Sequence, residues 1–102
     1  MSLTAATVNK QYLLAYQNEL EYKISLIRQA KLSLSNSTTE LLNVGTDMDP
    51  ENPAVKQLEQ RKERLNLLEK KLDMQLAEYE EKLKMVEKNL EACDKMIDSA
   101  IK

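Results

Sequence analysis

Very few side chains in this sequence are suited to catalysis. It contains no histidine and a single cysteine, Cys93, so the commonest general base and the commonest soft metal ligands are largely missing. Glu78, Glu80 and Glu81 could in principle pair as a general acid and a general base. They lie among lysines, however, which favours a solvated charged surface. We therefore predict that the chain is not an enzyme and has no catalytic residue and no cofactor.

Metal binding is not expected either. Asp47, Asp49 and Glu51 alternate in the way that ligands of a hard cation do, but this segment lacks the further ligand positions and the terminal glutamate of an EF-hand loop. Cys93 falls in the apolar heptad pattern described below, which favours a small buried hydrophobic residue over a reactive thiol.

Charge and hydropathy limit the kinds of partner that the chain could bind. The 102 residues include 15 Lys and Arg against 17 Asp and Glu, giving a net charge of −2 without a concentrated basic region, so no nucleic acid is expected. The longest apolar run, Leu13 to Tyr16, is far shorter than the roughly 20 residues that span a bilayer, so no membrane insertion is expected. We expect synthesis in the cytoplasm, and the sequence is compatible with export to the cell surface without a cleavable signal peptide.

The apolar residues repeat every seven positions in both halves of the chain, which is the pattern of helices that pack lengthwise. This repeat predicts an all-α fold, a two-helix antiparallel coiled-coil hairpin with a heptad seam. The predicted intramolecular seam consists of Leu13, Leu20, Ile27, Leu34 and Leu41 in the first half, and of Leu58, Leu65, Leu72, Leu76, Tyr79, Leu83, Val86, Leu90, Cys93 and Ile97 in the second. Ala6 and Ala100 extend the two series.

One helical-hairpin domain is predicted over residues 1–102. Its first helix covers about residues 4–44 and its second about 53–101, and a short turn at 45–52 makes an antiparallel pair the simplest arrangement. The hydroxyl-rich segment 33–39 competes for backbone hydrogen bonds, so we expect a bend, fraying or a break there.

Four residues define the predicted turn. Gly45 supplies the left-handed residue that commonly ends a helix, while Pro50 and Pro53 prevent one continuous helix. Asn52 is the expected N-cap of the second helix and Pro53 its first residue.

Each predicted helix also carries a second apolar strip nearly opposite the seam. This predicted intersubunit face consists of Val8, Tyr22, Leu26, Leu67, Met74, Met85, Ala92 and Met96. Its three methionines are eleven residues apart, which keeps them on one side of a helix. Methionine and alanine tolerate exposure, so the strip could be incidental, but an apolar strip of this length usually marks an interaction surface. We expect the partner to be the chain itself, as a homo-oligomer or filament, with a partner helix as the other possibility.

Two short segments resemble a known family. Pro50-Glu51-Asn52-Pro53-Ala54-Val55, followed by Leu58, resembles the turn between the helices of bacterial type III secretion needle subunits. Asp94-Lys95-Met96-Ile97-Asp98-Ser99-Ala100-Ile101 is similar to the stretch near their C-termini. The match covers about fifteen residues, and the chain is longer than typical needle subunits and has a stricter heptad seam. In that family, small helical hairpins are exported without a cleaved signal and stack into a hollow extracellular filament, and the resemblance implies the same plan here.

The predicted function is a self-assembling structural subunit of a filament, needle or rod in a secretion or surface apparatus. The alternative is a coiled-coil adaptor or secretion chaperone that binds a partner helix. The number of copies, their symmetry and the helix that would face inward stay open.

Overall fold

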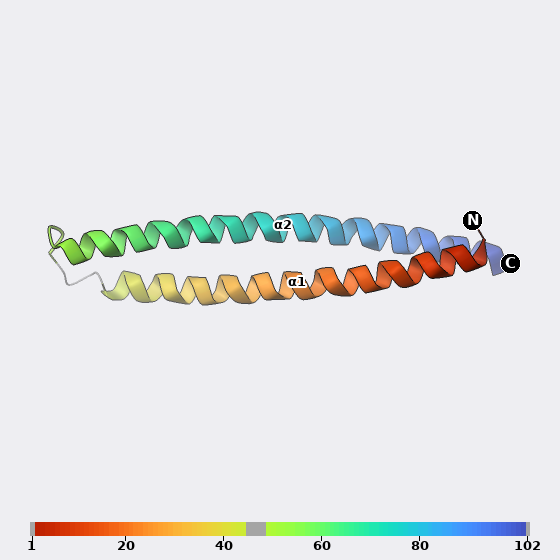
Figure 1. The fold of residues 1–102 in the computed structure, drawn as a ribbon, viewed down its shortest axis with the longest axis horizontal. Coiled ribbons are helices and arrows are strands. Elements are labelled where there is room, and N and C mark those ends of the chain that lie inside the picture. Colours follow the sequence, from red (N-terminus) through yellow and green to blue (C-terminus); the bar gives the residue numbers. More distant parts are fainter. Residues whose placement is uncertain (1, 45–48, 102) are drawn as a thin grey trace. The chain divides into compact units, whose positions relative to one another are not determined.

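Two α-helices make up the described part of the chain. A computed structural model describes residues 2–44 and 49–101, with helix α1 at Leu3–Val44 and helix α2 at Pro53–Ile101 (Figure 1). These residues contain no strand, and the two helices pack against each other as a helical hairpin. The predicted all-α hairpin fold is therefore confirmed. Within the described ranges, neither helix includes a segment long and apolar enough to cross a membrane.

The contacts between the helices divide the chain into two compact units, each built from a piece of α1 and a piece of α2. The terminal unit combines Met1–Ser25 with Ala77–Lys102, and the turn unit is Leu26–Leu76. The single helical-hairpin domain over residues 1–102 stays a prediction.

Helix α1 begins at Leu3, one residue before the predicted start, because Ser2 caps it. The backbone N–H of Ala5 donates to the Ser2 Oγ at 3.1 Å, and the N–H of Ala6 donates to the Ser2 carbonyl at 2.9 Å. A serine in this position satisfies backbone donors that the first helical turn leaves unpaired.

Helix α2 begins at Pro53 with Asn52 as its N-cap. The Ala54 N–H donates to the Asn52 Oδ1 at 3.0 Å, and the missing N–H of Pro53 costs nothing at a first helical position. A β-turn leads into the cap: the Asn52 N–H donates to the Asp49 carbonyl at 2.9 Å, with Pro50 at its second position. Gly45 lies outside the described residues.

Of the predicted bend, fraying or break at residues 33–39, a break does not occur, because these residues belong to α1 without interruption. Two hydroxyls of this segment bond to carbonyls of the same helix. Thr38 Oγ1 donates to the Leu34 carbonyl at 2.9 Å, and Thr39 Oγ1 donates to the Ser35 carbonyl at 3.0 Å. The Leu34 side chain is buried, and burial of apolar side chains stabilises the helix at residues 33–39.

The two units differ in how completely they bury their apolar residues. The terminal unit has a closed core in which Leu13, Leu20, Val86, Leu90 and Cys93 pack together, with Tyr16, Tyr79 and Leu83 against them. In the turn unit, Ile27 and Leu34 of α1 are buried, but the seam residues of α2 are only half-buried. Hydrophobic stabilisation scales with the apolar area removed from water, so the terminal unit gains more of it from α2.

Candidate functional site

The predicted seam residues all lie on the packed side of the helices. Seven are buried and eight are half-buried. The buried ones are Leu13, Leu20, Ile27, Leu34, Val86, Leu90 and Cys93, and the half-buried ones are Leu41, Leu58, Leu65, Leu72, Leu76, Tyr79, Leu83 and Ile97. Of the two residues that extend the series, Ala6 is buried and Ala100 is exposed.

A second line of α1 residues also lies at the seam, although the apolar heptad pattern of the sequence does not predict it. Ile24 is only 5% exposed, and Lys10, Gln17, Lys31 and Thr38 are half-buried at the same heptad position. Each follows an apolar seam residue by four positions, and this spacing could have placed them at the seam. Hydrophobic periodicity does not reveal them, because four of the five residues are polar.

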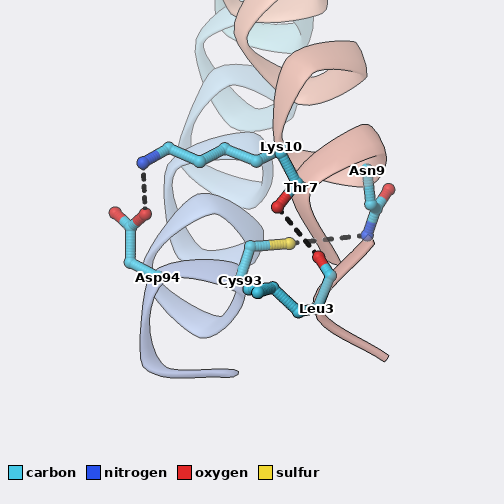
Figure 2. Close-up of polar contacts among 6 residues, drawn as sticks. All are labelled: Leu3, Thr7, Asn9, Lys10, Cys93 and Asp94. Carbon is cyan, nitrogen blue, oxygen red and sulfur yellow. Dashed lines mark hydrogen bonds and ion pairs between the residues drawn. The ribbon is translucent and has the colours of Figure 1, made fainter. Parts of the chain in front are cut away.

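Two polar seam positions of α1, Lys10 and Lys31, form ion pairs with α2, one pair in each unit. Lys10 Nζ lies 2.6 Å from the Asp94 Oδ1 in the terminal unit, and Lys31 pairs with Asp73 in the turn unit (Figure 2 shows the first pair). The hydrogen bond to Asp94 raises the pKa of Lys10 above its ordinary value. Each pair links one residue of α1 to one residue of α2, and exposed pairs of this kind add little to stability.

Aromatic and charged side chains meet at the edge of the terminal unit's core. Tyr79 of α2 is half-buried against the core, and the ammonium groups of Lys23 and Lys82 each lie 5.6 Å from its ring centroid. The Lys23 Nζ also lies 3.0 Å from the Glu19 Oε1, and this contact raises the pKa of Lys23. Ammonium groups at this distance from a tyrosine ring are attracted to its electron-rich face.

Cys93 is a structural residue of the terminal unit's core. Its side chain is 3% exposed, and its Sγ accepts a hydrogen bond from the Asn9 Nδ2 at 3.4 Å (Figure 2). A buried thiol in apolar surroundings is poorly accessible to reagents.

The acidic residues considered for chemistry do not converge on a metal site. In the part of the chain that the structure describes, no group of three or more His, Cys, Asp or Glu side chains could hold a metal ion. Glu78 pairs with Lys82 at 3.3 Å. Asp49 accepts the Glu51 N–H through its Oδ1 at 3.1 Å, and Asp47 lies outside the described residues.

All eight residues of the predicted intersubunit face are exposed in the single chain. Val8, Tyr22, Leu26, Leu67, Met74, Met85, Ala92 and Met96 belong to this set. Met74 is 73% exposed and Met85 60% exposed, which leaves most of both side chains in contact with water. Exposure in one copy is the condition for an intersubunit contact and does not by itself identify what covers the face.

A hollow of about 470 Å³, which the sequence pattern does not predict, lies in the turn unit. Its lining combines half-buried leucines with exposed charged residues and consists of Ser37, Glu40, Leu41, Arg61, Arg64 and Leu65. We call this hollow the turn-unit groove.

Comparison with known proteins adds no further assignment. A scan of protein-family models found no match to this chain, and neither did searches of curated proteins and of solved structures. The resemblance to needle subunits therefore stays a prediction.

Proposed function

We propose that this protein is a self-assembling structural subunit that forms a filament, needle or rod in a secretion or surface apparatus. The observation that carries the proposal is the exposed intersubunit face, which lies on both helices while the heptad seam is used within the chain. An exposed apolar strip of this extent is a typical protein contact surface.

Self-association would cover this face with another copy of the same chain. Apolar residues lie on α1 at Val8 and Tyr22 and on α2 at Met74 and Met85, and each of these side chains is at least 60% exposed. When a contact joins two different surfaces of the chain, each added copy leaves one surface free. Such contacts form a ring if the rotation between copies closes and an extended filament if it does not. The resemblance of the turn and the tail to needle subunits supports the same proposal. The compatibility of the sequence with export without a cleaved signal supports it too.

Electron microscopy of the purified chain over a series of concentrations tests the proposal. We expect fibres whose number and length increase with protein concentration. A small particle of constant size at every concentration would instead favour the alternative, a coiled-coil adaptor or secretion chaperone that binds a partner helix.

A further inference from the structure

We propose that a stripe along α1 in the terminal unit packs against the same stripe of a second copy, in the antiparallel direction, to form a two-fold symmetric dimer. We call it the tyrosine stripe, and it consists of Ala5, Val8, Tyr12, Ala15, Glu19 and Tyr22. This inference rests on the proposed self-assembly, because it names one contact through which two copies would join.

The tyrosine stripe has the spacing of a coiled-coil seam. Its residues lie alternately three and four positions apart, which keeps them on one side of a helix that packs lengthwise against another. The seam within the chain uses a different side of α1, the side that carries the buried Leu13 and Leu20. All six residues of the tyrosine stripe are exposed, with Tyr12 at 67% and Tyr22 at 65%. The described part of the chain therefore leaves a second heptad repeat of α1 uncovered.

Few charges accompany the tyrosine stripe. In the terminal unit, α2 carries eleven charged residues, whereas α1 carries four, namely Lys10, Glu19, Glu21 and Lys23. Of these four, only Glu19 belongs to the stripe, and its Oε1 lies 3.0 Å from the Lys23 Nζ beside it. Lys10 pairs with Asp94 at the seam. The centres of protein interfaces are depleted of charge and enriched in tyrosine, and the tyrosine stripe has both properties.

The low charge of the tyrosine stripe favours the same stripe as its partner. Packing against the outward side of α2 would remove several charged side chains from water, which is unfavourable unless each one meets an opposite charge. A second tyrosine stripe brings only Glu19, which keeps Lys23 beside it. A surface that packs against its own copy gives a two-fold symmetric dimer.

The order of residues in the tyrosine stripe favours the antiparallel direction. In a parallel pair each residue faces its own copy, so Glu19 would face Glu19, and like charges in a contact are unfavourable. In the antiparallel pair, one register places Tyr12 opposite Ala15 and Tyr22 opposite Ala5 of the second copy. Large side chains then face small ones, which is the arrangement that fills a contact without voids. In this register Glu19 lies opposite Val8.

The two tyrosines offer much of the area that a stable dimer needs. A tyrosine buries about 150–250 Å² when fully covered, so the exposed fractions of Tyr12 and Tyr22 offer about 400–650 Å² over two copies. Stable interfaces bury at least about 1,200 Å², and Val8, which is 60% exposed, adds to the tyrosine area. The Tyr12 ring also stacks on Tyr16, with centroids 6.5 Å apart, and Tyr16 packs against the core. This stacking orders the exposed ring before binding, which lowers the entropy lost in the contact.

Tyr12→Glu tests the contact in the full-length chain by sedimentation velocity. It should raise the dissociation constant of the dimer by about tenfold or more, because two-fold symmetry places the lost ring and the added charge in the contact twice. The matched control is Thr7→Glu, which adds the same charge at an exposed residue of α1 outside the stripe. The control should change the dissociation constant by less than about threefold. Far-UV circular dichroism checks that both variants keep their helicity.

Disulfide cross-linking tests the direction of the pair. Val8→Cys and Glu19→Cys keep both tyrosines, and the two positions face each other only in the antiparallel register. An equimolar mixture of the two variants should form a disulfide-linked heterodimer under mild oxidation, whereas neither variant alone should link to itself. Cys93 is 3% exposed, and the wild-type chain is the control for linkage through it. Linkage of each variant to itself but not to the other would show a parallel pair and overturn the proposed arrangement.

The outcomes separate this inference from the proposed function. Two-fold contacts close after two copies, so a filament needs a further contact, for which Met85 and Met96 of α2 stay exposed. Open-ended growth that is equally strong in the wild-type chain and in the Tyr12→Glu variant would overturn the tyrosine-stripe dimer and leave the filament proposal standing. A dimer of constant size that depends on Tyr12 would support the tyrosine stripe and overturn the filament proposal. A wild-type chain that stays monomeric at every concentration would overturn both.

Discussion

Replacing Met74 and Met85 together with glutamate is expected to weaken self-assembly strongly without unfolding the chain. Met74 is 73% exposed and Met85 60% exposed, so folding of one copy buries little of either side chain. Glutamate is also a good helix former, which leaves the helical preference of α2 almost unchanged. The substitutions should therefore act on the contact between copies and hardly on the stability of each copy.

The exposed fractions give the expected size of the effect. Full burial of a methionine side chain is worth about 1.5–3 kcal/mol, and scaling this value by the two exposed fractions gives about 2–4 kcal/mol per copy for the pair. A loss of that size raises the concentration needed for assembly by about 30-fold to 700-fold. Burial of two unpaired carboxylates in the contact would add to the loss.

Light scattering over a concentration series measures the shift, and far-UV circular dichroism measures helicity. The matched control is Asn66→Asp with Gln75→Glu, which adds the same two negative charges at exposed positions of α2 outside the intersubunit face. The control should assemble at nearly the wild-type concentration. Assembly of the methionine variant at the wild-type concentration would show that these residues do not form the contact.

Three further predictions concern the stability of the single chain. Leu20→Ala should lower the free energy of unfolding by about 2–5 kcal/mol because Leu20 is 1% exposed in the closed core, whereas Leu65→Ala at a half-buried position of the turn unit should lower it less. Urea denaturation compares the two, and equal losses would contradict the difference in packing between the units. Asn52→Ala should lower the same free energy by about 0.5–2 kcal/mol through loss of the cap on the Ala54 N–H, and no measurable change would show that the cap is dispensable. The raised pKa of Lys10 means that its pair with Asp94 stabilises the folded chain at pH values below the ordinary lysine pKa, and that this contribution is lost as the pH rises through the raised pKa. Asp94→Asn should return the pKa of Lys10 toward its ordinary value in an NMR titration, and an unchanged titration curve would refute the assignment.

The fold follows from features that are local in the sequence. A heptad repeat of apolar residues specifies which side of each helix is packed, and residues such as Leu20 and Val86 are buried where that repeat places them. The start of α2 follows from two adjacent residues. The Asn52 side chain caps the helix, and Pro53 suits its first turn.

Other features depend on contacts that a single sequence does not display. The polar residues Lys10 and Lys31 lie at the seam because carboxylates of α2 reach them, and hydrophobic periodicity gives no weight to such positions. Helix α1 also continues through residues 33–39, where the hydroxyls of Thr38 and Thr39 bond to carbonyls of their own helix.

The turn-unit groove could not be predicted for a related reason. It depends on how completely Leu41 and Leu65 are covered, and the half-burial of both side chains is a property of packing. The charges at its rim were visible in the sequence, but the apolar floor between them was not.

Sedimentation velocity of the unmodified chain across a wide concentration range tests self-assembly most directly. We expect a distribution that moves to larger sedimentation coefficients as the concentration rises, without a limiting size, because each added copy presents a new contact surface. A single monomeric species with an unchanged coefficient at every concentration would contradict the proposed function.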